Sequence, residues 1–442
     1  MIVRTILEWG SIAYGDGDAE LPDQAADRIA AVAAASPLAG RGEGGVLEHG
    51  RKALRARGVV GLIAADGVVL EILPKIDVPG DSEAQQRGNT RKQLVHMLAE
   101  ALDMKIDTGA FADHDWQRNT LLEILIRTFS SGLVDAVRQG MPRRYVLEES
   151  DLPALRGRLN VQRQFTALVA SPQRLACRYD ALSPEIALNR IMKAAVTRLL
   201  GITRALDNRR RLQELALTYA EIAAFPVAAL PWNDVVLDRT NLRWRSLLKL
   251  AKLLLGERFQ TTSSGGVAGV TLLFEMNTLF EEYVARMLAH AVAKDGLKVV
   301  AQGGRVYCLE VNGNQGLFQT RPDILIKRGD QVVQVIDTKW KRIAKRVDDP
   351  KQGVSQSDIY QMMAYGRLYG CRRLTLLYPH HSGIGKEEAG RLTSHEVFRS
   401  GGDWLETATI DITSSRPALL AGLRDLCSFQ ERQDEATASS TV

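Results

Sequence analysis

The motifs Arg321-Pro322-Asp323 and Asp337-Thr338-Lys339, separated by thirteen residues, decide how the C-terminal part of the chain is expected to fold. Each adjoins a short apolar run rich in β-branched residues, 324–328 and 331–336, which is the pattern of strands. The turn sequence Arg-Gly-Asp-Gln at 328–331 lies between the two runs. We therefore predict a hairpin of two strands that brings Asp323 close to Asp337.

The side chains at the end of this hairpin are suited to phosphodiester hydrolysis. Residues two apart in a strand share a face of the sheet, so Asp337 and Lys339 should project side by side. Asp323 and Asp337 could together hold Mg²⁺, with Mn²⁺ as a substitute. The Lys339 amine could orient or help deprotonate the attacking water and offset charge on the phosphate. The competing interpretation is a surface hairpin whose charged groups are only solvated.

Helices are predicted on both sides of the two motifs. Apolar residues recur at spacings of three and four over 276–288, which predicts a helix with Glu281 and Glu282 at the borders of its apolar stripe. Further on, Gln361 and Tyr365 lie one helical turn apart and face the same way. A solvated helix edge for the glutamates, and a buried tyrosine beside a capping amide, are the structural alternatives.

These four elements, in this order, resemble the PD-(D/E)xK nuclease superfamily, here as Pro322-Asp323 and Asp337-Thr338-Lys339. The resemblance implies a third metal-binding acid on the upstream helix, for which Glu281 is the better match of the two glutamates. RecB-like members carry a similar QxxxY helix over the metal site, where Gln361 could touch DNA or the lysine. The implied catalytic set is Asp323, Asp337, Lys339, Glu281, Gln361 and Tyr365, and the implied metal ligands are Asp323, Asp337 and Glu281.

The composition is that of a soluble globular protein with a basic balance. The chain has 442 residues, enough for about three domains, and 45% of them are hydrophobic and 25% charged. A net charge of +5 is compatible with a polyanionic partner but does not require one. Basic residues crowd just after the second motif, where we expect DNA contact, at Lys341, Arg342, Lys345 and Arg346.

The cysteines and the N-terminal sequence favour a cytoplasmic protein. Cys177, Cys308, Cys371 and Cys427 are isolated from one another and are expected to be core thiols in a reducing compartment. The first residues lack the profile of a signal peptide, and no apolar run reaches 18 residues. We therefore expect a cytoplasmic location and no membrane partner.

The expected fold class is α/β and multidomain, with three regions and a tail. Residues 1–87 should form a mixed α+β, β-rich domain, which includes a hairpin around Asp66-Gly67. Residues 88–260 should be mainly helical, and Gly256–Gly266 has the composition of a linker. Residues 261–430 should form a restriction-endonuclease-like α/β domain of the PD-(D/E)xK type, and residues 431–442 a disordered tail.

Short motifs along nearly the whole chain sharpen the resemblance. They are Leu70-Glu-Ile-Leu-Pro-Lys-Ile76, Leu155-Arg-Gly-Arg-Leu159, Cys177-Arg-Tyr-Asp-Ala-Leu-Ser183 with Asn189-Arg190, and Met276-Asn-Thr-Leu-Phe-Glu281 before the two central motifs. In this order they resemble the McrC family, the nuclease subunit of McrBC-type modification-dependent restriction systems. One departure is Glu275, which stands where the family pattern has an aspartate.

The McrC resemblance implies a division of labour within a type IV restriction system. A separate McrB-like AAA+ GTPase hexamer would recognise and translocate modified double-stranded DNA of the methylcytosine type. The McrC-like chain would dock on that ring, stimulate GTP hydrolysis and cleave the DNA with Mg²⁺. The sequence agrees in lacking the pattern GxxxxGK[ST], and the N-terminal domain would be the docking part.

Two other functions stay open at this point. One is a RecB-like DNA repair nuclease that works without a GTPase partner. The other is a non-catalytic activator and scaffold of the motor, which is disfavoured because Asp323, Asp337 and Lys339 are all present.

Overall fold

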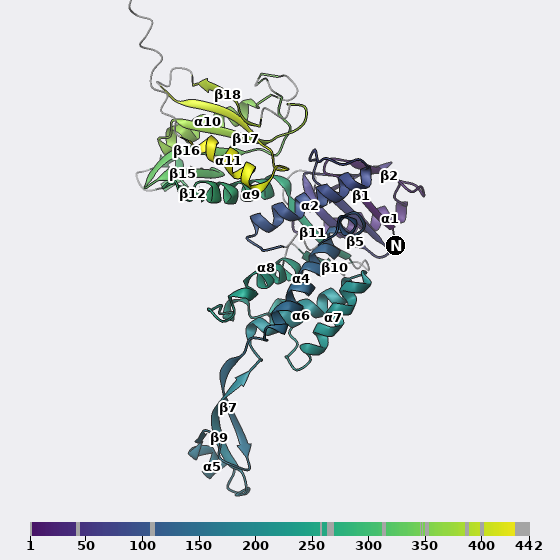
Figure 1. Ribbon diagram of the computed structural model, residues 1–442, viewed down its shortest axis with the longest axis vertical. Helices are drawn as coiled ribbons and strands as arrows, with labels where there is room; N and C mark the ends of the chain where they lie inside the picture. The colour runs from purple at the N-terminus through teal and green to yellow at the C-terminus, as the bar shows by residue number, and fades with distance from the viewer. Residues whose placement is uncertain are drawn as a thin grey trace, which may run out of the picture. The chain divides into compact units, whose positions relative to one another are not determined.

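The computed structural model describes residues 2–40, 45–106, 111–256, 259–262, 269–311, 315–344, 346, 348–349, 353–384, 389–397 and 402–428. The described chain is a mixed α/β protein with several sheets, as predicted (Figure 1). It divides into two compact units. Unit 1 comprises 1–34, 38–118 and 273–442, and unit 2 comprises 35–37 and 119–272.

The N-terminal part of unit 1 is built on three strands. β1 (Ile2–Leu7) pairs in parallel with β6 (Val68–Leu73), and β5 (Val59–Ala65) pairs with β6 in antiparallel. The turn between β5 and β6 contains Gly67 at φ 73°, a conformation that glycine adopts without strain. The predicted hairpin around Asp66-Gly67 is therefore confirmed.

Two helices and a small sheet accompany these strands. α1 (Asp23–Ala34) packs on β5, and α2 (Glu83–Ala101) packs on β6. Beside them, β2 (Ser11–Ala13), β4 (Ala53–Ala56) and β3 (Leu47–His49) form an antiparallel sheet. α3 (Asp113–Arg118) packs on α2 and ends the N-terminal stretch of unit 1.

The C-terminal part of unit 1 is a six-stranded mixed sheet, called the C-terminal sheet below. Its order is β12-β15-β16-β17-β19-β18. The strands are β12 (Lys298–Ala301), β15 (Ile324–Arg328), β16 (Gln331–Thr338), β17 (Arg373–Pro379), β19 (Trp404–Ile410) and β18 (Gly390–Glu396). β15 and β16 pair in antiparallel through the turn at Gly329, so this hairpin is also confirmed.

Three helices cover the C-terminal sheet. α10 (Gln356–Tyr369) connects β16 to β17, because parallel neighbours need a crossover. It packs its Met362 and Tyr365 into a core with Val335 and Leu376. α9 (Met276–Ala291) and α11 (Arg416–Cys427) pack on each other, and the buried Gln334 of β16 donates to the carbonyl of Leu426 in α11. Alternate residues of β16 therefore face different helices.

A separate ribbon leads into the first motif. β13 (Tyr307–Val311) and β14 (Gln315–Gln319) form an antiparallel pair outside the C-terminal sheet. Cys308 lies on this ribbon and is exposed, whereas Cys177, Cys371 and Cys427 are buried. The prediction that all four cysteines are core thiols is therefore wrong for Cys308, because a two-stranded ribbon buries neither of its faces.

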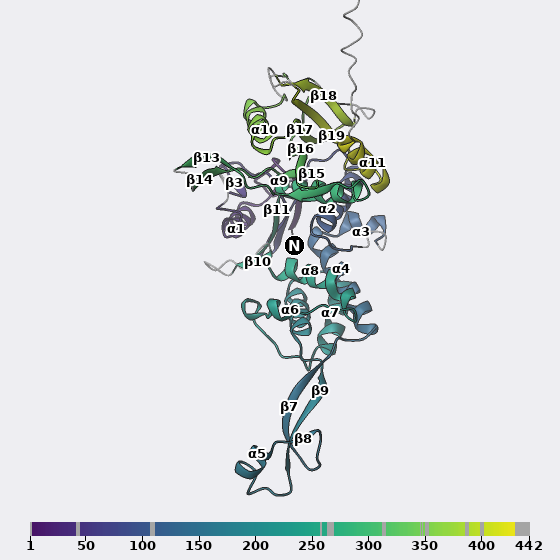
Figure 2. The same cartoon turned by 90° about the vertical axis from the view of Figure 1, so that its left-hand side faces the viewer.

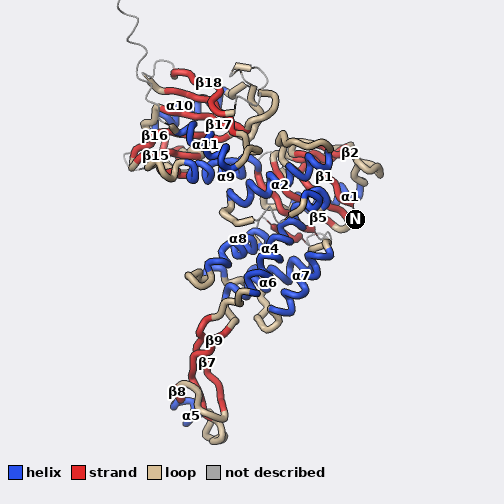
Figure 3. The backbone as a smooth tube through the Cα atoms, in the orientation of Figure 1, coloured by secondary structure: helices blue, strands red, loops and turns tan. Residues whose placement is uncertain are grey.

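Unit 2 combines a helical bundle with an arm made of strands (Figures 2 and 3). The bundle contains α4 (Leu121–Arg138), α6 (Ala187–Ile202), α7 (Leu206–Thr218) and α8 (Arg245–Leu255). Three short 3-10 helices, Val227–Ala229, Trp232–Asp234 and Leu242–Trp244, connect α7 to α8. The arm consists of β7 (Arg144–Leu152), β9 (Leu175–Ser183), β8 (Arg158–Leu159) and the short helix α5 (Val161–Thr166).

The arm adds strands that were not expected to a middle region that is mainly helical, as predicted. β7 is exposed along most of its length, so its sequence has no buried face to produce a strand periodicity. Gly157, at φ 70°, lets the chain cross β9, since an added Cβ would lie 2.5 Å from the Arg178 carbonyl oxygen. The motif 155–159 thus builds the arm.

The region boundaries also differ from the divisions of the structure. α2 lies in unit 1 although 88–260 was assigned to the middle region, and the units change at 118/119 and 272/273 rather than at 87/88 and 260/261. Part of the predicted linker 256–266 forms β10 (Phe259–Thr262), which pairs with the start of β11 (Gly269–Glu275). The predicted tail 431–442 lies outside the described residues. No described helix is both long and apolar enough to span a bilayer.

A buried ion pair joins α2 to β6. Both guanidinium nitrogens Nε and Nη2 of Arg91 donate to the two carboxylate oxygens of Glu71, at 2.9 and 2.6 Å. Arg91 also donates to the carbonyl of Trp116, and the Glu71 side chain is fully buried. Because neither charge is solvated by water, each is stabilised mainly by the other, and removal of one destabilises the fold.

We predict that Arg91→Met destabilises unit 1 by about 3–5 kcal/mol, because it removes the positive charge that faces the buried Glu71 carboxylate. Thermal or urea unfolding of the full chain measures the change. The matched control is Arg87→Met on the same helix, which removes an exposed pair with Glu83 and should change stability by less than about 0.5 kcal/mol. Equal effects of the two substitutions would contradict the prediction.

Candidate functional site

The hairpin β15–β16 brings the two predicted aspartates together. Ile324 pairs with Ile336, so Asp323 and Asp337 occupy the next position in the same register. Asp323 Oδ2 accepts hydrogen bonds from the backbone N–H of Thr338 at 2.8 Å and from the Thr338 hydroxyl at 2.9 Å. Thr338 therefore fixes the Asp323 carboxylate beside Asp337.

Asp337 is buried and carries the central charge of the site. Its residue is 0% exposed, and Lys339 Nζ lies 2.8 Å from its Oδ2. Its Oδ1 has no hydrogen-bond donor among the described residues. A buried carboxylate oxygen without a donor is uncommon and favours an additional ligand such as a cation.

The electrostatics of the two aspartates agree with this arrangement. Burial, followed by the charge of Asp323, raises the pKa of Asp337 from 3.8 to about 6, against the opposing effect of Lys339. Burial also raises the pKa of Asp323, although the donors of Thr338 counteract it. Two acids with disfavoured charges in one place are a common mark of a functional site.

The third predicted acid, Glu281, belongs to the same electrostatic group. Burial, then the charge of Asp323, raises the pKa of Glu281 to about 7. Glu281 and Glu282 both line a cavity of about 670 Å³ together with His290 and Gln302. The Coulombic influence of Asp323 on Glu281 favours Glu281 as the third acid of the site.

The QxxxY helix reaches the lysine, as the resemblance implies. Lys339 Nζ lies 3.5 Å from Gln361 Oε1, and Gln361 Nε2 donates to the Tyr365 hydroxyl at 2.8 Å. Tyr365 is 5% exposed and belongs to the core between α10 and the sheet. Gln361 thus links the lysine to a fixed side chain.

The structure adds Asp358, which the sequence reasoning missed. Its carboxylate lies 3.6 Å from Lys339 Nζ and 3.0 Å from Lys341 Nζ. Asp358 stands one turn before Gln361, and its backbone N–H donates to the hydroxyl of the N-cap Ser355. The pattern Ser-x-x-Asp at the start of an amphipathic helix was the signal that could have revealed it.

The acidic neighbours of Lys339 raise the pKa of its amine. Burial alone would lower its pKa, but Asp337 and then Asp358 raise it overall. As an ammonium group it can orient a water or stabilise negative charge. The expectation that Lys339 also helps to deprotonate the attacking water stays a prediction.

The basic cluster after the second motif is neutralised within the chain. Lys341 pairs with Asp358, Arg342 pairs with Asp77, and Arg346 pairs with Asp348. Lys345 lies outside the described residues. The expected DNA contacts of this cluster would therefore require an exchange of ionic partners.

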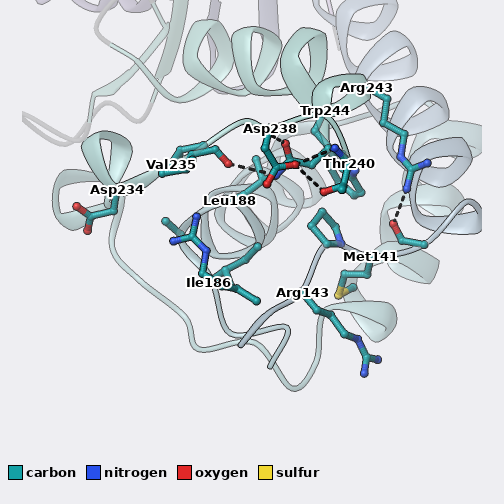
Figure 4. A pocket seen from close by; sticks show the side chains of 16 residues that line it. Met141, Arg143, Ile186, Leu188, Asp234, Val235, Asp238, Thr240, Arg243 and Trp244 are labelled. Carbon is teal, nitrogen blue, oxygen red and sulfur yellow. Dashed lines mark hydrogen bonds between the residues drawn. The ribbon is translucent and has the colours of Figure 1, made fainter. Parts of the chain in front are cut away.

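A second cavity, of about 260 Å³, lies in unit 2 at the base of the arm (Figure 4). Asp238, which lines it, accepts hydrogen bonds from the backbone N–H and hydroxyl of Thr240 at 2.8 and 2.6 Å. Arg243 donates to the carbonyls of Gln139 and Gly140. These charged groups hold loops in place, and the cavity offers no counterpart to the grouping of Asp323, Asp337 and Lys339.

The fit of a divalent cation can be judged from the donors alone. Among the described residues, no three acidic, histidine or cysteine side chains already enclose a metal position. Mg²⁺ needs only one or two carboxylates, because it retains several waters. Asp323 and Asp337, with the unpaired Oδ1 of Asp337, meet that requirement.

Comparison with known proteins gives a consistent result. The family model described as "McrBC 5-methylcytosine restriction system component" matches residues 54–379. A chain in the refined half-complex from the tetradecameric assembly of Thermococcus gammatolerans McrB AAA+ hexamers with bound McrC shares the fold, with a TM-score of 0.70 and 22% identity over 96% of this chain and 99% of that one. A chain of the cryo-EM structure of the Thermococcus gammatolerans McrBC complex gives a TM-score of 0.52 and 27% identity over 66% and 88%. No curated protein matched the sequence.

We predict that Asp337→Asn stabilises the protein at pH 7.5 in the presence of EDTA. With its pKa raised to about 6, the folded state binds this proton more tightly than the unfolded state, so ionised Asp337 costs stability above pH 6. The gain should be present at pH 7.5 and should shrink as the pH falls through 6 toward 4. Thermal unfolding at several pH values measures it.

Asp358→Asn is the control with the opposite sign. Burial alone would raise the pKa of Asp358, but the Ser355 hydroxyl and the lysine charges lower it overall. This substitution should therefore lower the melting temperature at pH 7.5. A lower melting temperature for Asp337→Asn would mean that the pair with Lys339 outweighs the cost of burial.

Proposed function

Because the chain belongs to the McrBC 5-methylcytosine restriction system component family, we propose that it is the DNA-cleaving subunit of such a system. The proposed reaction is Mg²⁺-dependent hydrolysis of phosphodiester bonds in modified double-stranded DNA of the methylcytosine type. The observation that carries the proposal is the buried Asp337 beside the half-buried Asp323, with Lys339 Nζ 2.8 Å from Asp337. The C-terminal sheet would then be a nuclease core of the PD-(D/E)xK type.

The described residues would divide the work as follows. Asp323 and Asp337 would hold the cation, and Glu281 would add negative charge from α9. The bound cation would polarise the scissile phosphate and lower the pKa of a water. The Lys339 ammonium would orient the attacking water and offset charge on the phosphate, while Gln361 and Asp358 hold the lysine in place.

The partner proposed for this chain is a McrB-like AAA+ GTPase hexamer. The similar solved assemblies contain McrB AAA+ hexamers with bound McrC. The sequence itself has no GxxxxGK[ST] pattern, so nucleotide hydrolysis would fall to the partner. This partner distinguishes the proposal from a RecB-like nuclease that acts alone.

The arm of unit 2 is the surface best suited to docking on that partner. It exposes large apolar side chains that a lone ribbon would not need, and apolar groups gathered on a surface mark interaction sites. Those most exposed are Tyr145 (70%), Leu155 (59%), Val161 (59%), Phe165 (72%) and Val169 (67%). We therefore place docking on the arm, in addition to the N-terminal domain expected from the sequence.

We predict that Asp337→Ala abolishes cleavage of methylated DNA and leaves stimulation of the partner's GTPase intact. The reason is that the carboxylates lie in the C-terminal sheet, whereas the proposed docking arm belongs to unit 2. The assay reconstitutes the chain with its GTPase partner, GTP and Mg²⁺, and measures cutting of methylated and unmethylated DNA. Cleavage by the variant, or wild-type cleavage that needs neither GTP nor methylation, would overturn the assignment.

We further predict that the double substitution Leu155→Ser and Phe165→Ser weakens the complex with the GTPase at least tenfold. Both side chains are mostly exposed, so the fold of unit 2 should not depend on them. Leu217→Ser, at an exposed leucine of α7, is the matched control and should bind normally. Titration of the labelled chain with the partner measures binding, and normal binding by the double variant would exclude the arm.

A further inference from the structure

The four residues that follow the catalytic strand are held alternately from two sides. Lys339 and Lys341 both lie close to Asp358 of α10, at 3.6 and 3.0 Å. Trp340 and Arg342, which alternate with them, bind Glu8 and Asp77 of the N-terminal part of unit 1. The segment 339–342 therefore connects the candidate site to a distant part of the sequence.

The contact through Trp340 is specific. Trp340 Nε1 donates to Glu8 Oε1 at 2.6 Å, and the same oxygen accepts from the backbone N–H of Lys75 at 2.8 Å. Glu8 is only 2% exposed. The backbone N–H of Lys75 thus helps to orient the Glu8 carboxylate toward the indole. Because Glu8 is buried, loss of the hydrogen bond from Trp340 would leave a polar group unsatisfied and cost free energy.

Trp340 also contacts α9, the helix that carries Glu281. Its ring packs edge-to-face on Phe280, with ring centroids 5.2 Å apart, and Phe280 is the neighbour of Glu281 in the sequence. The backbone N–H of Trp340 donates to Asn277 Oδ1 at 3.3 Å. One side chain therefore touches the helix that carries the third acid while its backbone continues from Lys339.

Asp77 makes a second connection between the N-terminal part of unit 1 and the segments next to the candidate site. Its Oδ1 pairs with Arg342, and its Oδ2 accepts from the backbone N–H and the hydroxyl of Ser382 at 3.0 and 2.7 Å. Ser382 follows β17, the neighbour of β16 in the C-terminal sheet. Asp77 therefore ties together the two segments that leave the sheet beside the carboxylates.

Glu8 and Asp77 lie at the same end of the N-terminal strands. β1 and β6 are parallel neighbours, Leu7 pairs with Leu73, and the backbone N–H of Glu8 donates to the Leu73 carbonyl. Glu8 follows β1, and Lys75 and Asp77 follow β6. The motif Leu70–Ile76 ends at these strand ends. It therefore places the backbone of Lys75 against Glu8 and leads directly to Asp77.

We propose that Glu8 and Asp77 are positioning residues of the nuclease, which act on Lys339 through Trp340 and Arg342. The N-terminal strands thereby set the geometry of the cutting site, so the domain is part of the nuclease and not only a docking module. This inference rests on the proposed function, because it names what controls the same site.

The test uses the full chain in complex with its GTPase and compares Trp340→Phe, Glu8→Ala, Glu8→Gln and Asp77→Ala. Trp340→Phe keeps a ring on Phe280 but removes the Nε1–H donor. We expect kcat for cleavage to fall at least tenfold in Trp340→Phe, Glu8→Ala and Asp77→Ala, with KM for DNA and GTPase stimulation unchanged. Glu8→Gln retains the accepting oxygen and should recover most of the activity.

The control is Asp295→Ala, which also removes a carboxylate paired with an arginine, Arg424, at the far end of α9. It should leave kcat unchanged. A parallel loss of kcat, GTPase stimulation and melting temperature in the three variants, without rescue by Glu8→Gln, would indicate general destabilisation and overturn the inference. Full activity of Trp340→Phe and Asp77→Ala would overturn it as well.

Failure of the proposed function gives a different result from failure of this inference. If the proposed function is wrong, the wild-type complex does not cut DNA, or the Asp337→Ala variant still cuts it.

Discussion

The close approach of two carboxylates, one buried and one half-buried, is the constraint on which the rest of the site depends. Asp323 and Asp337 repel each other, and burial raises the pKa of both. The chain holds them there with the two donors of Thr338 on Asp323 and the ammonium of Lys339 on Asp337. Such an arrangement costs stability in the absence of a ligand, and a protein retains it when the charge serves a reaction.

The surrounding cations show how this charge is balanced. Each described basic side chain over 339–342 has an acidic partner, and Asp358 serves two of them. A DNA backbone approaching this surface would exchange one anion for another instead of meeting unpaired cations. The gain in affinity from the cluster would then be smaller than its sequence suggests, because fewer counterions are released.

The sequence predicts what depends on local periodicity and misses what depends on distant contacts. The hairpin β15–β16, the helix of Glu281 and the pair of Gln361 and Tyr365 follow from alternation, turn residues and helical spacing. The structure pairs Asp323 with Asp337 in register, brings Gln361 to Lys339 and lets the charge of Asp323 act on Glu281. The arm was missed because a ribbon exposed on both faces leaves no apolar period. The hydrogen bond from Trp340 to Glu8 joins residues 332 positions apart in the sequence, and no local sequence pattern predicts such a contact.

The acidic neighbours of Lys339 influence the chemistry that the site can perform. Asp337 and then Asp358 raise the pKa of the lysine against the effect of burial, which favours the ammonium form that contributes charge and direction. Its contribution then depends on where it lies, because a misplacement of about 1 Å in a catalytic geometry can cost roughly 100-fold in rate. Position is supplied by Gln361 and Asp358 on one side and by the backbone that continues into Trp340 on the other. A site of this kind is therefore sensitive to how residues 340–342 are held, even though none of them belongs to the proposed metal ligands.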